Sequence, residues 1–281
     1  MAASSRRRVQ RSRRRNTASD LGARVWVAIP AAAYAIGIVA AGGPVFAAGV
    51  VLLGFVCLHE LFDMYRALGP VRLAGFIGLA GLAAAAHFGG EHQVLLATVA
   101  IFPLLFLLAL AMPERRDVPL TDGISITLLG TLWVGLAIAH AILLRELPHG
   151  GGLVLAVLLG TFIGDTTAYL GGRTLGTRPL AARISPKKTV EGLLCGILGS
   201  ALAVWWYGLS SEWMGGVNGI LLGVGVGLAA PVGDLFESKL KRDAGAKDSG
   251  TLFGAHGGAL DRLDAALFTL VAGYYVWSLL L

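Results

Sequence analysis

The chain has 281 residues, of which 56% are hydrophobic and only 14% charged, against about 25% charged residues in an average soluble domain. This composition excludes an ordinary soluble enzyme and a disordered protein. The net charge of +6 comes from 23 Lys and Arg residues against 17 Asp and Glu residues. Forty glycines without a G-X-Y period exclude collagen and are typical of helices that pack closely in lipid.

The chain begins with a strongly basic segment. Seven arginines lie between Arg6 and Arg15. Such a run could neutralise nucleic-acid phosphates, but we favour a disordered arm attracted to anionic lipid. We therefore expect residues 1–23 to form a basic disordered cytoplasmic arm without a nucleic-acid partner, followed by a single membrane domain over residues 24–281.

Nine apolar runs follow, each near the length of about 20 residues that a helix needs to cross a bilayer. They are rich in Leu, Ala and Gly and do not alternate apolar with polar residues, so an all-α bundle of about nine transmembrane helices is predicted in preference to a β-barrel. The predicted spans are Val25–Ala41, Val45–Met64, Leu73–Phe88, Val94–Met112, Ile124–Leu144, Leu153–Leu170, Val190–Leu209, Val217–Phe236 and Asp264–Leu281.

The cations predict how these spans are oriented. With a cytoplasmic N-terminus, 22 of the 23 Lys and Arg residues fall on the cytoplasmic side, and Arg145 alone falls on the other. This agrees with the positive-inside rule and with an odd number of spans, so we expect the C-terminus outside.

Two predicted cytoplasmic loops, residues 171–189 and 237–263, contain all five lysines of the chain. In the first loop, Ser185, Lys187 and Lys188 precede the start of the seventh span, where free helix N–H groups favour an anion. The alternative is a basic loop that contacts lipid headgroups. Asp165, within the preceding span, is a functional candidate because a carboxylate in the membrane is unfavourable; a buried ion pair is the alternative.

The second loop is denser in charge. Asp234, Glu237 and Lys241 have helical spacing, and Asp261 and Asp264 are three apart at the start of the last span. Two carboxylates facing the same way repel each other unless a cation lies between them, and Mg²⁺ suits oxygen ligands shared with phosphate. Zinc is disfavoured, since the two cysteines, Cys57 and Cys195, lie in apolar runs.

These residues together indicate phosphoryl or nucleotidyl transfer at the lipid headgroup plane, with Lys247 and Arg262 as further cations for phosphate. His256, beside two glycines, suggests either a backbone bend that approaches a ligand or a merely structural turn.

The second loop also carries a recognisable motif. The segments 238–242 (Ser-Lys-Leu-Lys-Arg), 247–250 (Lys-Asp-Ser-Gly) and 253–264, which contains His256-Gly257-Gly258 and Asp261-Arg262-Leu263-Asp264, resemble the signature of the phosphatidate cytidylyltransferases, also called CDP-diglyceride synthetases. The segment 184–192 is similar to that family as well. Ala259 departs from the pattern, which usually has a larger aliphatic residue there.

The resemblance implies the conversion of CTP and phosphatidic acid to CDP-diacylglycerol and pyrophosphate, for phospholipid biosynthesis. It implies a required Mg²⁺, allows a second, monovalent cation, and implies a bundle in the bacterial inner (cell) membrane, often a homodimer, with a cytoplasmic active site. By position, the metal ligands would be Asp234, Asp261 and Asp264, and the catalytic residues these three with Lys247. Substrate binding would involve Ser185, Lys187, Lys188, Lys241, Arg242, His256, Arg262 and Asp165.

Other activities remain alternatives. A CTP-dependent lipid kinase would share the setting but release CDP, and a cytidylyltransferase could act on another lipid phosphate such as an isoprenoid phosphate. A transporter would place ionisable residues near several span centres, whereas here most lie in loops. A CDP-alcohol phosphatidyltransferase is disfavoured because its D-G-x-x-A-R run is missing.

Overall fold

The computed structural model describes residues 29–111, 118–252 and 257–281. By its internal contacts the chain divides into two units, residues 1–41 and 42–281. The described part of the first unit is a short apolar helix, Ile29–Ala41. The predicted basic arm, residues 1–23, lies outside the described residues and stays a prediction.

The second unit is a succession of helices. In chain order they are α2 (Gly43–Met64), the short 3-10 turn η1 (Arg66–Leu68), α3 (Arg72–Gly89), α4 (Glu91–Leu110), α5 (Leu120–Gly130), α6 (Leu136–Glu146), α7 (Gly150–Leu175), α8 (Val190–Leu209), α9 (Gly216–Asp243) and α10 (Leu260–Ser278). A π-helical segment, η2 (Thr131–Gly135), joins α5 and α6 into one helix from Leu120 to Glu146.

The helices confirm the predicted all-α membrane architecture. Seven helices of the described chain are long and apolar enough to cross a membrane, with α5–α6 counted as one. The first predicted span corresponds to the shorter helix Ile29–Ala41, and the last to α10, whose first turns contain Asp261, Arg262 and Asp264. The chain is therefore a polytopic integral membrane protein.

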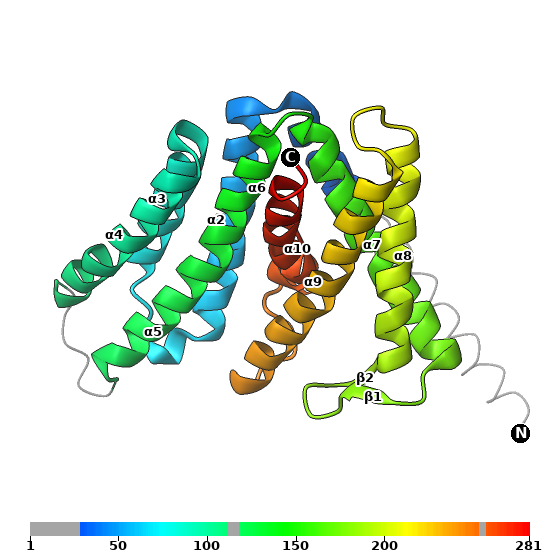
Figure 1. Cartoon of the computed structure of the whole chain (residues 1–281). Helices are drawn as coiled ribbons and strands as arrows, with labels where there is room; N and C mark the ends of the chain where they lie inside the picture. The colour runs from blue at the N-terminus through cyan, green and yellow to red at the C-terminus, as the bar shows by residue number, and fades with distance from the viewer. Residues whose placement is uncertain (1–28, 112–117, 253–256) are drawn as a thin grey trace, which may run out of the picture. The chain divides into compact units, whose positions relative to one another are not determined.

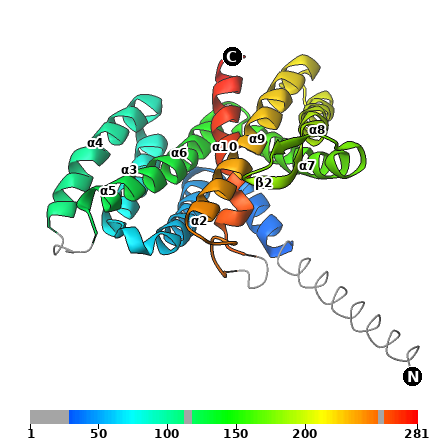
Figure 2. The same ribbon diagram turned by 90° about the horizontal axis from the view of Figure 1, so that it is seen from below.

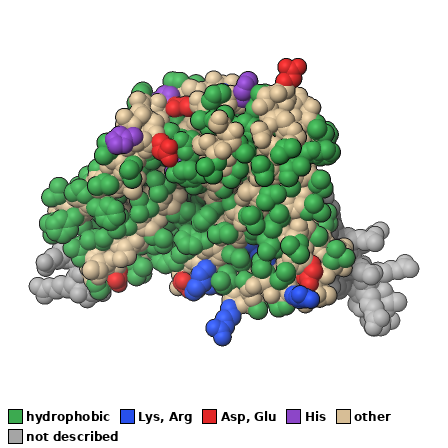
Figure 3. All heavy atoms as spheres, viewed as in Figure 1, with side chains coloured by type: hydrophobic (Ala, Val, Ile, Leu, Met, Phe, Trp, Pro, Cys, Tyr) green, Lys and Arg blue, Asp and Glu red, His purple; other side chains and the backbone are tan. Residues whose placement is uncertain are grey.

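Within residues 42–281, α9 and α10 lie between two groups of helices (Figures 1 and 2). One group includes α3 and α4, and the other is formed by α7 and α8. The β-hairpin and the C-terminal end of α9 lie at one end of the bundle, and Leu281 lies at the other (Figure 1). On the face shown in Figure 3, hydrophobic side chains cover the middle, while Lys and Arg side chains lie along the lower edge. Which end faces the cytoplasm stays a prediction.

Glycines allow two of these helices to approach closely. A Cβ atom at Gly219, Gly223 or Gly227 of α9 would lie 2.9, 2.6 or 2.8 Å from the backbone of α8. These residues recur every four positions, so they form one face of the helix. Small residues at such a face let backbones pack in lipid, as the glycine content predicted.

Two parts of the loop prediction need correction. Residues 171–175 of the predicted first loop belong to α7, and the rest contains a two-stranded antiparallel sheet, β1 (Pro179–Ala181) and β2 (Ser185–Thr189). In addition, α10 begins at Leu260, four residues before the predicted start of the last span. Asp261 therefore lies in the first turn of a helix, where the positive end of the helix dipole favours its negative charge.

Candidate active site

The hairpin between α7 and α8 carries three of the predicted substrate-binding residues. Ser185, Lys187 and Lys188 all lie on β2, with Lys187 exposed and the other two half-buried. Thr189 is the N-cap of α8, and its hydroxyl accepts a hydrogen bond from the N–H of Gly192 at 3.1 Å. The predicted helix start beside two lysines is confirmed, but one of its N–H groups already has a partner within the chain.

Glu191 holds the other strand of this hairpin. Its carboxylate accepts hydrogen bonds from the Thr177 N–H at 3.0 Å, the Thr177 hydroxyl at 2.7 Å and the Arg178 N–H at 3.2 Å. These bonds tie the chain before β1 to the first turn of α8. The two lysines of β2 are thereby kept beside the end of α7.

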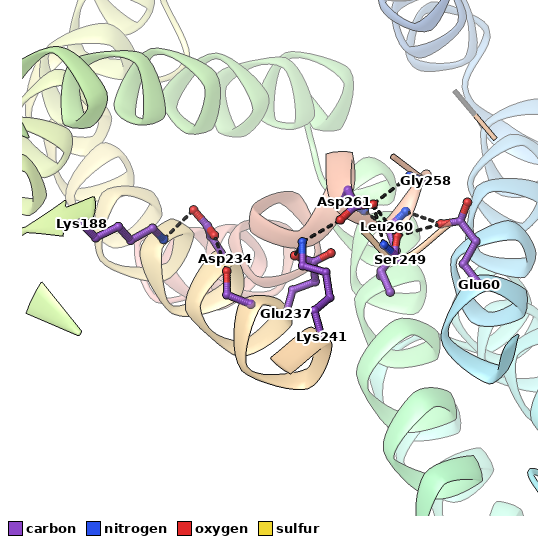
Figure 4. A network of polar contacts seen from close by, with 10 residues as sticks. Glu60, Lys188, Asp234, Glu237, Lys241, Ser249, Gly258, Leu260 and Asp261 are labelled. Carbon is purple, nitrogen blue, oxygen red and sulfur yellow. Dashed lines mark hydrogen bonds and ion pairs between the residues drawn. The ribbon is translucent and has the colours of Figure 1, made fainter. Parts of the chain in front are cut away.

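Lys188 points from the hairpin towards α9. Its ammonium group lies 2.5 Å from a carboxylate oxygen of Asp234, and this ion pair is visible in Figure 4. The Ser238 hydroxyl donates to the other oxygen of Asp234 at 3.3 Å. The structure therefore brings together a predicted phosphate-binding lysine and a predicted metal ligand that are 46 residues apart in the sequence.

Asp165, Asp234 and Asp264 form an acidic group contributed by α7, α9 and α10. The charges of Asp234 and Asp165 both act on Asp264, and that of Asp234 also acts on Asp165. A Cβ atom at Gly233 would lie 2.4 Å from the Asp264 carbonyl oxygen, so α9 and α10 touch at this level. Lys188 is a nearby cation for this group, acting on Asp165 as well as on Asp234.

Asp261 has a different environment. One of its carboxylate oxygens lies 2.6 Å from the Lys241 ammonium group, and the other accepts hydrogen bonds at 2.8 Å from the Gly258 N–H, the Ser249 N–H and the Ser249 hydroxyl. Lys241 also pairs with Glu237 at 2.5 Å. The structure thus places Asp261 with Lys241 rather than with the acidic group, and its role as a metal ligand stays a prediction.

A cavity of about 570 Å³ lies between α7, α8, α9 and the hairpin. Its polar lining includes Asp165, Arg173, Lys187, Lys188 and Asp234. Its apolar lining includes Ala168, Leu180, Leu193, Ala230 and Pro231. The cavity therefore joins cations and carboxylates at one site to apolar side chains, which suits an amphipathic substrate with phosphate groups.

The carboxylates at this cavity fit Mg²⁺ in their chemistry. Among the described residues, no three Asp, Glu, His or Cys side chains converge closely enough to hold a metal by themselves. Mg²⁺ commonly takes only one or two carboxylates and completes its shell with water and substrate phosphates. Asp165 and Asp234 line the cavity and Asp264 adds its charge from α10, so Mg²⁺ would relieve the repulsion in this group.

The remaining predicted residues lie near the second loop. Arg242 is exposed on the last turn of α9, Lys247 is exposed beyond it, and Arg262 is exposed in the first turn of α10. His256 lies outside the described residues. α9 continues to Asp243, so the helical spacing predicted for Asp234, Glu237 and Lys241 is confirmed.

One residue at the site was missed by the sequence analysis. Glu60 of α2 is only 6% exposed and accepts hydrogen bonds from the first residues of α10. A carboxylate inside the apolar run Val45–Met64 is by itself a signal of function, because a charge in the membrane is unfavourable. The sequence contained this signal.

The chain is similar to known proteins over most of its length. The model of the cytidylyltransferase family matches residues 22–280. A phosphatidate cytidylyltransferase of Synechocystis is 34% identical over 92% of this chain and 97% of its own length. A phosphatidate cytidylyltransferase of Mycobacterium bovis is 30% identical over 93% of this chain and 89% of its own length. The chloroplastic phosphatidate cytidylyltransferase 4 of Arabidopsis thaliana is 31% identical over 84% of this chain and 68% of its own length.

Proposed function

The chain belongs to the cytidylyltransferase family, and we propose that it transfers the cytidylyl group of CTP to phosphatidic acid, forming CDP-diacylglycerol and pyrophosphate. The observation that carries this proposal is the cavity, whose lining includes the cations Lys187, Lys188 and Arg173 and the carboxylates Asp165 and Asp234. It offers cations for two anionic substrates, carboxylates for a divalent ion and apolar walls for a lipid.

In the proposed reaction, a phosphate oxygen of the lipid attacks the α-phosphorus of CTP, a new P–O bond forms, and the bond to the pyrophosphate oxygen breaks. The attacking oxygen already carries negative charge near neutral pH, so no strong general base is needed. The main barrier is the repulsion between the two substrates. Lys187 and Lys188 lower that repulsion because their ammonium groups bind phosphate as compact charges.

Mg²⁺, bound by one or two carboxylates of the group Asp165, Asp234 and Asp264 and by substrate phosphates, would supply neutralisation of the triphosphate charge and orientation of its phosphates. The Lys188–Asp234 ion pair joins the two halves of the site. When CTP binds, Lys188 can exchange its carboxylate partner for a phosphate oxygen. This leaves Asp234 available at the cavity wall.

The experiment is an assay of the purified protein with CTP labelled at its α-phosphorus and phosphatidic acid in mixed micelles, with and without Mg²⁺. We expect the label in a lipid product and unlabelled pyrophosphate as co-product, both only with Mg²⁺. An undecaprenyl phosphate arm tests the isoprenoid acceptor. Labelled CDP as the co-product would instead indicate a lipid kinase, and no turnover with either lipid would contradict the proposal.

We also propose that the site faces the cytoplasm of a bacterial cell, in the inner membrane. The asymmetry of 22 Lys and Arg residues against one supports this orientation by the positive-inside rule. The location of the substrate agrees with it, because CTP is a cytoplasmic nucleotide. The homodimer that the resemblance implies stays a prediction, which chemical crosslinking in the membrane would check.

A further inference from the structure

Glu60 of α2 is bonded to residues that lie about 190 to 200 positions further along the chain. One of its carboxylate oxygens accepts a hydrogen bond from the Ala259 N–H at 3.0 Å, and the other from the Leu260 N–H at 2.9 Å. Ala259 is the N-cap of α10 and has no side chain that could fill this role. Glu60 therefore supplies the cap from another helix, where the helix dipole favours its negative charge.

The segment between α9 and α10 is shaped around this carboxylate. A Cβ atom at Gly250 would lie 2.6 Å from one Glu60 oxygen, and a Cβ atom at Gly258 would lie 2.2 Å from the other. Both distances are too short for any side chain, and the Glu60 oxygens are held by their donors. These glycines are therefore needed because the backbone passes directly against Glu60.

Ser249 connects Glu60 to the Asp261–Lys241 ion pair. The Ser249 hydroxyl lies 3.2 Å from a Glu60 oxygen and 2.8 Å from an Asp261 oxygen, and its single proton is donated to one of these two carboxylates at a time. Ser249 is buried at 6% exposure, so water does not readily replace these contacts. Figure 4 shows the resulting row of side chains from Glu60 through Ser249 and Asp261 to Lys241.

We propose that Glu60 is a positioning residue for the transfer reaction, an inference that rests on the proposed function. By capping α10 and holding Ser249, Glu60 fixes Asp261 against Lys241 and sets the level at which Asp264 faces Asp234. The reaction needs these charged groups in one arrangement because it depends on positioning and charge neutralisation. A helix of the N-terminal half thus positions residues of the C-terminal half.

The test compares Glu60→Gln with Asp63→Asn, a control that removes a carboxylate one turn later on the same helix. Asp63 is exposed and pairs with Arg72 and His59. In Glu60→Gln, the amide NH₂ group would face an N–H donor and break one half of the cap. We expect kcat to fall about tenfold or more, with the KM for CTP changed less than about twofold, and the control to match the wild type.

Two further variants separate positioning from folding. Ser249→Ala removes the hydroxyl that contacts Asp261 and accepts its N–H at 3.3 Å, but it leaves the bonds from the Ala259 and Leu260 N–H groups to Glu60 in place. We expect its loss of kcat to be non-additive with that of Glu60→Gln in the double variant. Glu60→Asp, which restores the charge, should recover part of the kcat. Active-site concentration, measured from bound CTP, is used to express kcat per folded molecule, so that poor folding is not counted as slow chemistry.

If Glu60→Gln keeps the wild-type kcat per folded molecule, or if the effects of Glu60→Gln and Ser249→Ala simply add, Glu60 is structural and the inference is wrong. If Glu60→Gln does not fold, Ser249→Ala decides, because a wild-type kcat in that variant breaks the proposed chain. A wild-type protein that forms no lipid-linked CMP overturns the proposed function and this inference together.

Discussion

Asp234 and Asp264 lie on helices that touch at Gly233, and their negative charges act on each other. We expect Asp234→Asn and Asp264→Asn each to lower kcat by about a hundredfold or more, because an amide keeps the shape but not the charge that would bind Mg²⁺. The measurement is the rate against Mg²⁺ concentration.

The control for these variants is Asp243→Asn, an exposed residue on the same helix α9 that pairs with Lys239. Its rate should equal that of the wild type, since an exposed ion pair contributes little. Wild-type activity of Asp264→Asn at saturating Mg²⁺ would remove the metal site proposed here.

Lys241 compensates two carboxylates that are almost completely buried. The side chains of Glu237 and Asp261 are 1% and 10% exposed, and one Glu237 oxygen has no hydrogen-bond partner among the described residues. We expect Lys241→Met to lower the free energy of unfolding by about 3–5 kcal/mol, because it leaves buried charge without its cation. Thermal unfolding of the detergent-solubilised protein measures this.

Lys239→Met is the matched control on the same helix. Lys239 is half-exposed and pairs with Asp243, so we expect a change of about 1 kcal/mol or less. Equal losses of stability in the two variants would show that the burial of Glu237 and Asp261 around Lys241 does not determine the free energy of unfolding.

At the scale of elements, the β1–β2 hairpin depends on Glu191. We expect Glu191→Ala to raise the KM for CTP several-fold and to change kcat less. The variant removes three hydrogen bonds that hold the chain just before β1, and β1 pairs with β2, the strand that carries Lys187 and Lys188. Steady-state kinetics with CTP as the varied substrate measures this effect. Glu212→Ala, at an exposed position between α8 and α9, is the control.

Lys187→Ala and Lys188→Ala should raise the same KM more than the corresponding arginine variants do, since arginine keeps the charge. If Glu191→Ala leaves the KM for CTP unchanged while Lys188→Ala raises it, the hairpin holds its shape without Glu191. That result would contradict the role given to this carboxylate.

The sequence predicted the helices better than the elements between them. The nine apolar runs were recognised because hydrocarbon selects long apolar segments, which are visible without any tertiary contact. The early start of α10 was missed because the helix continues beyond the apolar run into Asp261 and Leu260, and there the cap comes from Glu60. The hairpin was missed because β1 and β2 are short, contain Pro179 and Pro186, and show no alternating pattern.

The candidate site was predicted in part for the same reason. Residues close in sequence, such as Lys187 with Lys188 or Asp261 with Asp264, were recognised from local spacing. In the structure, Asp261 pairs with Lys241, whereas Asp264 lies near Asp234. This difference depends on how α9 packs on α10. No local pattern contains that information, and the same is true of the contact between Glu60 and Ser249.

At the scale of the whole molecule, the proposed mechanism requires that the hairpin and the α9–α10 segment reach CTP on the cytoplasmic side. The helix α8 has 20 residues, so it spans about 30 Å, the thickness of the hydrocarbon core. It joins the hairpin turn at Ala182 to the loop that begins at Ser210, and both residues are exposed. These two positions therefore report on opposite faces of the membrane.

We expect Ala182→Cys to react with a membrane-impermeant maleimide only after intact cells are permeabilised, and Ser210→Cys to react without permeabilisation. Leu281→Cys should behave like Ser210→Cys, because the C-terminus lies at the end of the bundle opposite the hairpin (Figure 1). The native Cys57 is fully buried and Cys195 is half-buried within α8, so the unmodified chain supplies the background reaction.

Labelling of Ala182→Cys in intact cells would invert the proposed orientation and place the cavity on the side that lacks CTP. Equal labelling of Ala182→Cys and Ser210→Cys in intact cells would contradict a transmembrane α8, and with it the bundle on which the site is built.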